Sequence, residues 1–224
     1  MALGRVSRVA KAVRLAVLAA VVWAACPASA LAQVQVPKMG VFAVDLRGVF
    51  ARYGPTDEQA AAIGYHVLDL PPRGWGIDVG AHVYPIRWYR VALGIGANVM
   101  RSAGNMAPVN AIGKPTGREA DTRFRTVGSQ LSVNFGNREG WSYLSAGLGY
   151  STFATSNAAY LEPETLPKRR TLNYGFGARW GFREHMAFSL DFRFYRIAAQ
   201  EATPAVAAAP GTTRFTLGAG LAFK

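Results

Sequence analysis

Apolar residues alternate with small or polar residues along most of the chain after residue 40. Residues 212–224 show the pattern most clearly, because one face of this stretch carries Phe215, Leu217, Ala219, Leu221 and Phe223. A period of two is typical of a β-strand with one apolar face. The opposite face is mostly glycine and other small residues, as expected where side chains share a narrow interior.

Eight stretches share this alternation and are predicted to be strands, at residues 40–53, 74–84, 88–101, 122–136, 141–153, 169–182, 186–197 and 212–224. Long loops at 54–73, 102–121, 154–168 and 198–211 alternate with short links at 85–87, 137–140 and 183–185. Strands joined by short links are antiparallel neighbours. The pattern therefore predicts an all-β fold: a closed, eight-stranded, antiparallel, up-and-down β-barrel.

The bulk of the apolar face decides which side of this barrel points outward. A soluble eight-stranded barrel, such as a lipocalin, turns its apolar face inward. The interior of eight strands is just wide enough for side chains to fill, so the many Trp and Phe side chains would overfill it. The apolar face is therefore expected to meet lipid, where closure also pairs every backbone group. Short turns at one end and long loops at the other match outer-membrane barrels, with both termini on the periplasmic side.

Residues 1–32 have the pattern of a cleaved secretory signal. A basic start precedes an apolar core and the small-x-small site Ala30-Leu31-Ala32, so cleavage is expected before Gln33. The alternative, a retained anchor helix, is disfavoured by the many alanines and by Pro27. Residues 33–39 are then a short periplasmic lead-in, and residues 40–224 form the barrel. The single cysteine, Cys26, leaves with the signal, which excludes disulfides from the mature protein.

The charge balance suggests an anionic partner. The signal holds four of the 25 Lys and Arg residues and none of the 13 acids, so the remaining chain carries a formal net charge of +8. A basic chain often binds nucleic acid. Export argues against nucleic acid here, and anionic lipid headgroups are the expected counter-ions.

The last strand also carries a recognisable motif. Thr216-x-Gly218-x-x-Leu221-x-Phe223 resembles the C-terminal assembly signal of bacterial outer-membrane barrels, although Lys224 follows the aromatic residue that most often comes last. The whole mature chain resembles the small eight-stranded outer-membrane β-barrels of the OmpA-transmembrane-domain and OmpX type. The resemblance implies a place in a Gram-negative outer membrane and delivery to the barrel-assembly machinery through this strand.

Charged side chains on the inward, glycine-rich face form a candidate network: Asp45, Arg47, Asp78, His82, Arg90, Arg179, Asp191 and Arg193. Buried charges persist when they are paired or hydrogen-bonded. These residues are therefore expected to form a salt-bridged plug of three Asp against four Arg, with His82 beside it. The alternative is a narrow ion path whose selectivity they set.

Five outward arginines near the loop ends of different strands form a candidate rim: Arg52, Arg101, Arg125, Arg170 and Arg196. The planar fork of donors on arginine suits phosphate, so we expect contacts with outer-leaflet lipopolysaccharide. The alternative is that these side chains simply reach toward water.

Catalytic chemistry has little support in the sequence. Of the three histidines, His66 lies in a loop, His82 in the lumen and His185 in a short turn, and none has a Ser and an acid at triad spacing. We expect no catalytic, metal or cofactor residues, and a structural or surface-interaction role with the loops open to an unidentified extracellular ligand. A small porin-like channel is the alternative, and a lipid-A-modifying enzyme is the weaker one.

Overall fold

The computed structural model describes residues 40–62, 64–108, 112, 114, 119–136, 140–157, 167–202 and 208–224. The predicted signal sequence and lead-in lie outside the described residues. Most of the short link at 137–140 and parts of the last three long loops lie outside them too.

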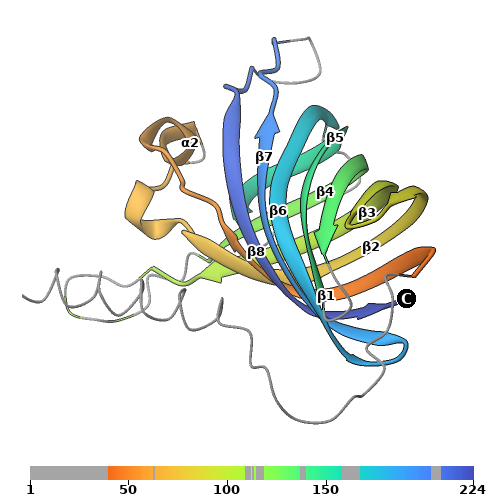
Figure 1. Cartoon of the computed structure of the whole chain (residues 1–224). Helices are drawn as coiled ribbons and strands as arrows, with labels where there is room; N and C mark the ends of the chain where they lie inside the picture. The colour runs from red at the N-terminus through yellow and green to blue at the C-terminus, as the bar shows by residue number, and fades with distance from the viewer. Residues whose placement is uncertain are drawn as a thin grey trace, which may run out of the picture. The chain divides into compact units, whose positions relative to one another are not determined.

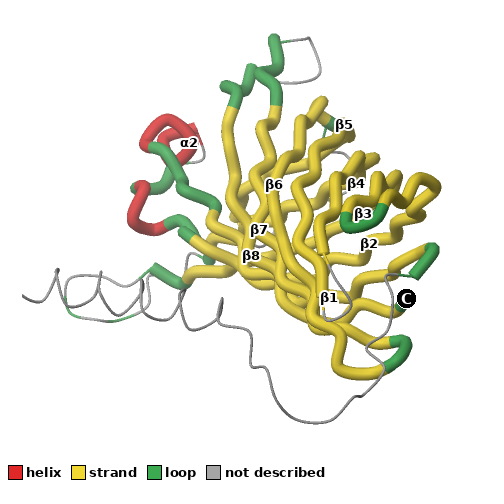
Figure 2. The backbone as a smooth tube through the Cα atoms, in the orientation of Figure 1, coloured by secondary structure: helices red, strands yellow, loops and turns green. Residues whose placement is uncertain are grey.

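Eight antiparallel strands close into one barrel in sequential order, which confirms the predicted fold (Figures 1 and 2). The strands are β1 Phe42–Arg52, β2 Arg73–Trp88, β3 Val91–Met106, β4 Ala120–Gly136, β5 Gly140–Asn157, β6 Arg169–Arg183, β7 Met186–Ile197 and β8 Thr212–Phe223. Closure is made by β8, which pairs with both β7 and β1. Each of these eight strands therefore has a paired neighbour on both sides.

Side-chain exposure follows the predicted parity. Along β1 the residues alternate between exposed and buried. Large apolar side chains lie on the outside, where Trp75 is 71% exposed and Leu131 is 66% exposed. The inward face carries the buried polar and charged residues, together with a smaller set of buried apolar side chains. This arrangement is the inverse of a soluble barrel, because the apolar surface that would normally form a core faces outward.

The link between β2 and β3 differs from its prediction. Pro85 does not begin a turn: β2 continues to Trp88 through a register shift between Val83 and Ile86. Proline cannot donate a ladder hydrogen bond, and such irregularities are where strands accommodate it. The chain reverses at Tyr89 and Arg90, where Tyr89 takes a left-handed conformation with φ of 53°.

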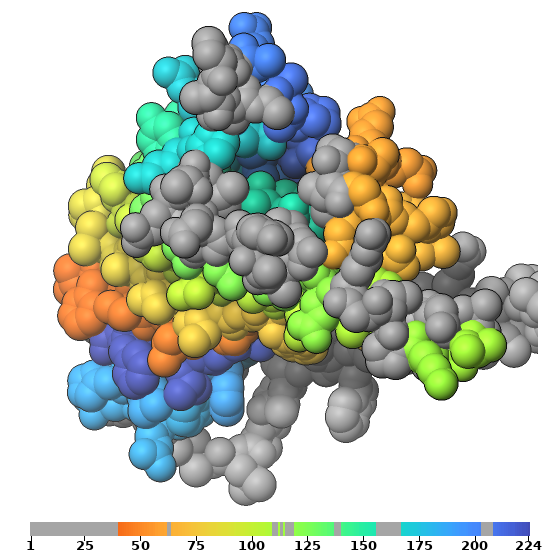
Figure 3. Space-filling model, turned by 180° about the vertical axis from the view of Figure 1, so that it is seen from behind, coloured from red at the N-terminus to blue at the C-terminus, as the bar shows by residue number. Residues whose placement is uncertain are grey.

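The first long connection contains short helices that the sequence pattern did not predict. These are α2, Asp57–Ala62, and the 3₁₀ turn η1, Val67–Asp69. Ala60 and Leu70 pack with Ala120 at the start of β4 in a small apolar cluster. Figure 3 shows this segment, in orange, projecting from one side of the barrel. No helix among the described residues is long and apolar enough to cross a membrane.

The two ends of the barrel differ. The two-residue turns Tyr89–Arg90 and Glu184–His185 lie at the same end as the start of β1 and the end of β8, where Val44 pairs with Phe223. This end is called the turn end below. The long connections leave from the opposite end, which is called the loop end.

Candidate functional site

Asp45 of β1 is the centre of the charged lumen. Its carboxylate is fully buried and accepts a hydrogen bond from Nε of Arg179 on β6 at 2.8 Å. Nη2 of Arg47 lies 2.8 Å from the same carboxylate, and the Ser189 hydroxyl donates to it at 2.9 Å. One carboxylate is therefore shared by two guanidinium groups from different strands, the geometry in which a buried charge is fully compensated.

Arg47 links this centre to a second carboxylate. Its Nη1 donates to Oδ2 of Asp78 on β2 at 2.7 Å, and its Nε donates to Ser189 at 2.8 Å. The amide of Asn98 donates to the other oxygen of Asp78 at 2.9 Å. Gly218 of β8 leaves the space that Arg47 occupies, because a Cβ there would lie 3.2 Å from Cδ of Arg47.

Asp191 of β7 is the third carboxylate of the network. Arg193 donates to its two oxygens from Nε at 3.0 Å and from Nη2 at 2.9 Å. The Tyr143 hydroxyl donates to Asp191 at 2.6 Å, and Nη1 of Arg193 donates to Asn173 at 2.9 Å. This pair is also satisfied on every side, so the charges are held by neighbours on β5, β6 and β7.

His82 lies beside the network. Its Nε2 is 2.9 Å from Oε1 of Gln130, and its ring is stacked on that of Tyr84. Its Nδ1 lies 3.8 Å from Oδ2 of Asp45 and has no hydrogen-bond partner among the described residues.

Arg90 was predicted to belong to this network, but the structure places it outside. The residue is exposed in the Tyr89–Arg90 turn, with its guanidinium 5.4 Å from the Tyr89 ring centroid. The parity of β3 did point Arg90 inward, but the strand begins only at Val91, so the turn carries the side chain out. Within the described residues the network is therefore three Asp against three Arg, which balances without Arg90.

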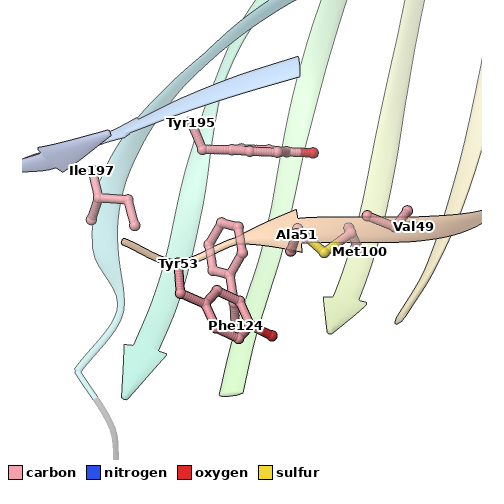
Figure 4. Packing of buried hydrophobic residues seen from close by; sticks show 7 residues of the cluster. All are labelled: Val49, Ala51, Tyr53, Met100, Phe124, Tyr195 and Ile197. Atoms are coloured by element: carbon pink, nitrogen blue, oxygen red, sulfur yellow. The ribbon is translucent and has the colours of Figure 1, made fainter. Parts of the chain in front are cut away.

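Apolar layers lie on both sides of these charges. Toward the loop end, a cluster in the lumen consists of Val49, Ala51, Tyr53, Met100, Phe124, Tyr195 and Ile197, whose side chains converge in Figure 4. Toward the turn end, Ala43, Tyr84 and Ala92 form a smaller cluster. The inward residues of β1 show this layering in order, from Ala43 through Asp45 and Arg47 to Val49 and Ala51. The charged layer thus lies in a low-dielectric setting, where pairing is required.

The sequence interpretation missed Arg214. Its side chain points inward from β8 and is 4% exposed, with its guanidinium carbon 4.2 Å from the Phe153 ring centroid. Nη1 donates to the carbonyl of Gly54 at 2.9 Å, whereas Nε and Nη2 have no partner among the described residues. The signal was present, because Arg214 shares its parity with Thr216 and Gly218.

The five rim arginines all lie on the outward face near the loop end. Arg101 and Arg125 are direct cross-strand partners on β3 and β4. Arg52 is on β1, opposite Arg73, while Arg170 and Arg196 lie on β6 and β7. None of the five has a carboxylate partner in the part of the chain that the structure describes. Arg123, also on β4, does have one, since its Nη2 is 3.8 Å from Asp121.

The residues of the C-terminal motif divide between the two faces of β8. Thr216 and Gly218 point into the lumen, whereas Phe223 is exposed on the outside, opposite Val44 and Met186. Nζ of Lys224 lies 5.3 Å from the Trp141 ring, and partial burial lowers the pKa of this ammonium group. The role of the motif in assembly stays a prediction.

The remaining histidines are placed apart from one another. Nδ1 of His66 accepts a hydrogen bond from the Leu68 amide as the cap of η1. His185 lies in the turn between β6 and β7. Among the described residues, no three or more His, Cys, Asp or Glu side chains gather in a way that could hold a metal ion.

One solved structure shares this fold with a TM-score above 0.5, and two others match with lower scores. Neisserial surface protein A is 13% identical, with a TM-score of 0.53 over 83% of this chain and 97% of its own. OprG from Pseudomonas aeruginosa is 12% identical, with a TM-score of 0.47 over 85% and 98%. Ail of Yersinia pestis, in complex with the heparin analogue sucrose octasulfate, is 13% identical, with a TM-score of 0.47 over 81% and 97%.

The comparisons with known sequences identify a family for this chain but no individual function. No curated protein matches the chain. A family model, described as the outer membrane protein beta-barrel domain, matches residues 17–223. The closed barrel, its outward apolar face and this match agree. The chain belongs to the outer membrane protein beta-barrel domain family and is an integral β-barrel protein of the bacterial outer membrane.

Proposed function

We infer that this protein acts at the cell surface as a closed barrel and is not a pore. The observation that carries this inference is the layered lumen, in which the Asp45, Asp78 and Asp191 ion pairs lie between two apolar clusters. A conducting path would need water beside these charges along the whole axis. Apolar layers oppose wetting, and hydrophobic constrictions close channels in this way.

Orientation follows from the general form of these barrels, in which short turns face the periplasm and longer loops face outward. The turn end is then periplasmic and the loop end extracellular. The folded first connection, with α2 and η1, then forms part of the external surface. Its exposed Leu68, 74% accessible, is a candidate contact for an extracellular partner.

Conductance in planar bilayers tests the closed lumen. Refolded protein that is inserted and protease-resistant is expected to give no discrete current steps. Reproducible single-channel steps would favour the small porin-like channel, and Asp191→Asn or Arg193→Gln would then be expected to change its ion selectivity. Failure of the protein to insert would count against both roles.

An enzymatic role in lipid A modification is the third hypothesis. The placements of His66, His82 and His185 do not support a shared catalytic centre. The mass of lipid A from expressing cells is expected to be unchanged. A new lipid A mass that depends on this protein would contradict the non-enzymatic role.

The rim arginines support a lipid partner. Arg52, Arg101, Arg125, Arg170 and Arg196 face outward near the loop end without carboxylate partners among the described residues, so phosphates of lipopolysaccharide are suitable counter-ions. Replacement of all five by Ser is expected to reduce lipopolysaccharide co-purification. Unchanged co-purification would mean that these side chains only reach toward water.

A further inference from the structure

A groove on the outside of the barrel crosses β3, β4 and β5 near the loop end. It has a volume of about 510 Å³, and it is lined by two rim arginines, Arg101 and Arg125, and by Lys168, which precedes β6. Lys168 was not among the residues that the sequence pattern assigned to the rim. The groove therefore gathers three cations in one place, whereas Arg52 and Arg196 lie on other strands.

The strand register divides the outward groove residues into two rows. The lower row consists of Val99, Val127 and Tyr150, which are successive cross-strand partners. The upper row, one outward position nearer the loop end, consists of Arg101, Arg125 and Thr152. Neighbouring outward positions on a strand are about 6.7 Å apart, so the cations lie directly above an apolar floor.

Among the described residues, no carboxylate compensates the cationic row. Arg101 and Arg125 are directly opposite each other, and like charges at such positions are destabilising. Nε of Arg125 is buried and has no hydrogen-bond partner among the described residues. Two positions along β4, Arg123 has an acidic partner in Asp121, whereas Arg125 has none among the described residues.

The apolar floor continues toward the turn end. The next outward pair is Ala97 and Ser129, and the Ser129 hydroxyl donates to the Leu148 carbonyl. Beyond this pair, Ile95 and Leu131 are cross-strand partners and more than half exposed. An acyl chain lying along this surface would exclude water from both rows. A single amphiphile could then satisfy the cations above and cover the apolar strip below.

We propose that this groove is a specific site for a phosphorylated glycolipid, the lipid A part of lipopolysaccharide. The proposal rests on the rim function inferred above and narrows it to one subsite. Arg125 and Arg101 bind one phosphate from both sides, Lys168 adds a third positive charge, and an acyl chain lies over Val99, Val127 and Tyr150. An inorganic anion would satisfy only the upper row, which is why the amphiphile is the better match.

Binding of fluorescent lipid A to the refolded full-length mature barrel in detergent micelles tests the site. The Arg101→Gln/Arg125→Gln variant is expected to lose about tenfold or more in affinity, the size of one to two charge-assisted hydrogen bonds. Arg125→Lys keeps the charge but loses the planar fork of donors, so it is expected to show a smaller loss of affinity than the double variant. Arg123→Gln is the matched control on the same strand and is expected to bind as the parent does.

Competitors and a second control separate the outcomes. Dephosphorylated lipid A, phosphatidylglycerol and inorganic phosphate are each expected to compete at least tenfold less well than lipid A. Equal competition by inorganic phosphate would show that the groove binds only an anion. Equal competition by phosphatidylglycerol would show that the groove has no preference for a glycolipid. Either result would overturn the proposal.

The Arg52→Gln/Arg196→Gln variant distinguishes a subsite from a diffuse rim. Affinity as low as that of the groove variant would overturn the subsite while leaving the rim function standing. Unchanged affinity in both double variants would contradict both the lipid-binding function of the rim and the lipid A site in the groove. Heat-dependent mobility on gels and protease resistance show that each variant is folded, so a loss of binding cannot come from failed assembly.

Discussion

The barrel carries two sets of arginines, and they meet opposite conditions. Arg47, Arg179 and Arg193 point into the lumen, where each contacts a buried aspartate. The rim arginines Arg101 and Arg125 point outward, and no carboxylate contacts them in the described part of the chain. A charge in the middle of the lumen is neutralised by the protein, because burial without a partner costs several kcal/mol. Arg214, nearer the loop end, has no acid partner among the described residues and contacts the Gly54 carbonyl and the Phe153 ring instead. A charge at the rim can leave its neutralisation to water or lipid.

This difference predicts that lumen and rim respond unequally to loss of charge. The lumen should lose stability, whereas the rim should lose binding and remain folded. The predictions below test that contrast in order of decreasing effect on stability.

Asp45→Ala is expected to have the largest effect. The change leaves Arg179 and Arg47 without their shared carboxylate, and breaking a buried pair costs about 3–5 kcal/mol. Urea unfolding in lipid vesicles, followed by tryptophan fluorescence, measures the loss. Asp121→Asn is the matched control, since its partly exposed pair with Arg123 is expected to contribute about 0–1 kcal/mol. Equal losses would contradict a sealed lumen.

Phe124→Ala is expected to weaken the apolar layer of the lumen. Phe124 is fully buried, with its ring centroid 5.4 Å from that of Tyr195, so truncation leaves a cavity that costs about 3 kcal/mol. The same unfolding assay measures this loss, and Phe124→Leu is expected to lose less. Bilayer recordings add a second readout, because conductance that appears only in Phe124→Ala would identify this layer as the seal.

Gly94→Ala tests the close packing of aromatic side chains over inward glycines. A Cβ at Gly94 would clash with Oγ of Ser132 and lie 2.8 Å from Cε1 of Tyr84, so both side chains must move at a cost of about 1–2 kcal/mol. Gly80→Ala is the matched inward control, because its Cβ would meet nothing nearer than 3.7 Å. The control is expected to be neutral or slightly stabilising, since alanine restricts the unfolded chain. Similar losses in both variants would argue against this packing.

Arg52→Gln is expected to have the smallest effect on stability. The residue is exposed and has no carboxylate partner among the described residues. The free energy of unfolding of the protein should therefore change by about 0.5 kcal/mol or less. The same vesicle unfolding assay applies. A loss as large as that of Asp45→Ala would remove the distinction between rim and lumen.

The sequence by itself determined the architecture. A period of two repeated in eight stretches, with alternating long and short links, specifies eight antiparallel strands, because strand parity and hairpin connectivity are local properties. The outward apolar face then requires closure, because lipid cannot pair the backbone groups of an open edge. Parity also placed Asp45, Asp78 and Asp191 on the inward face, where the structure has them. The prediction for Arg90 was wrong because parity applies only within a strand, and β3 begins one residue later.

Only the tertiary structure decided which charges meet. Pairing of Asp45 with Arg179 joins β1 to β6 across the lumen, and no local pattern specifies a contact between residues so distant in sequence. The same holds for the apolar layer around Phe124 and for the groove, whose three cations come from β3, β4 and the segment before β6. Closure and register set these neighbours, and they depend on every strand at once.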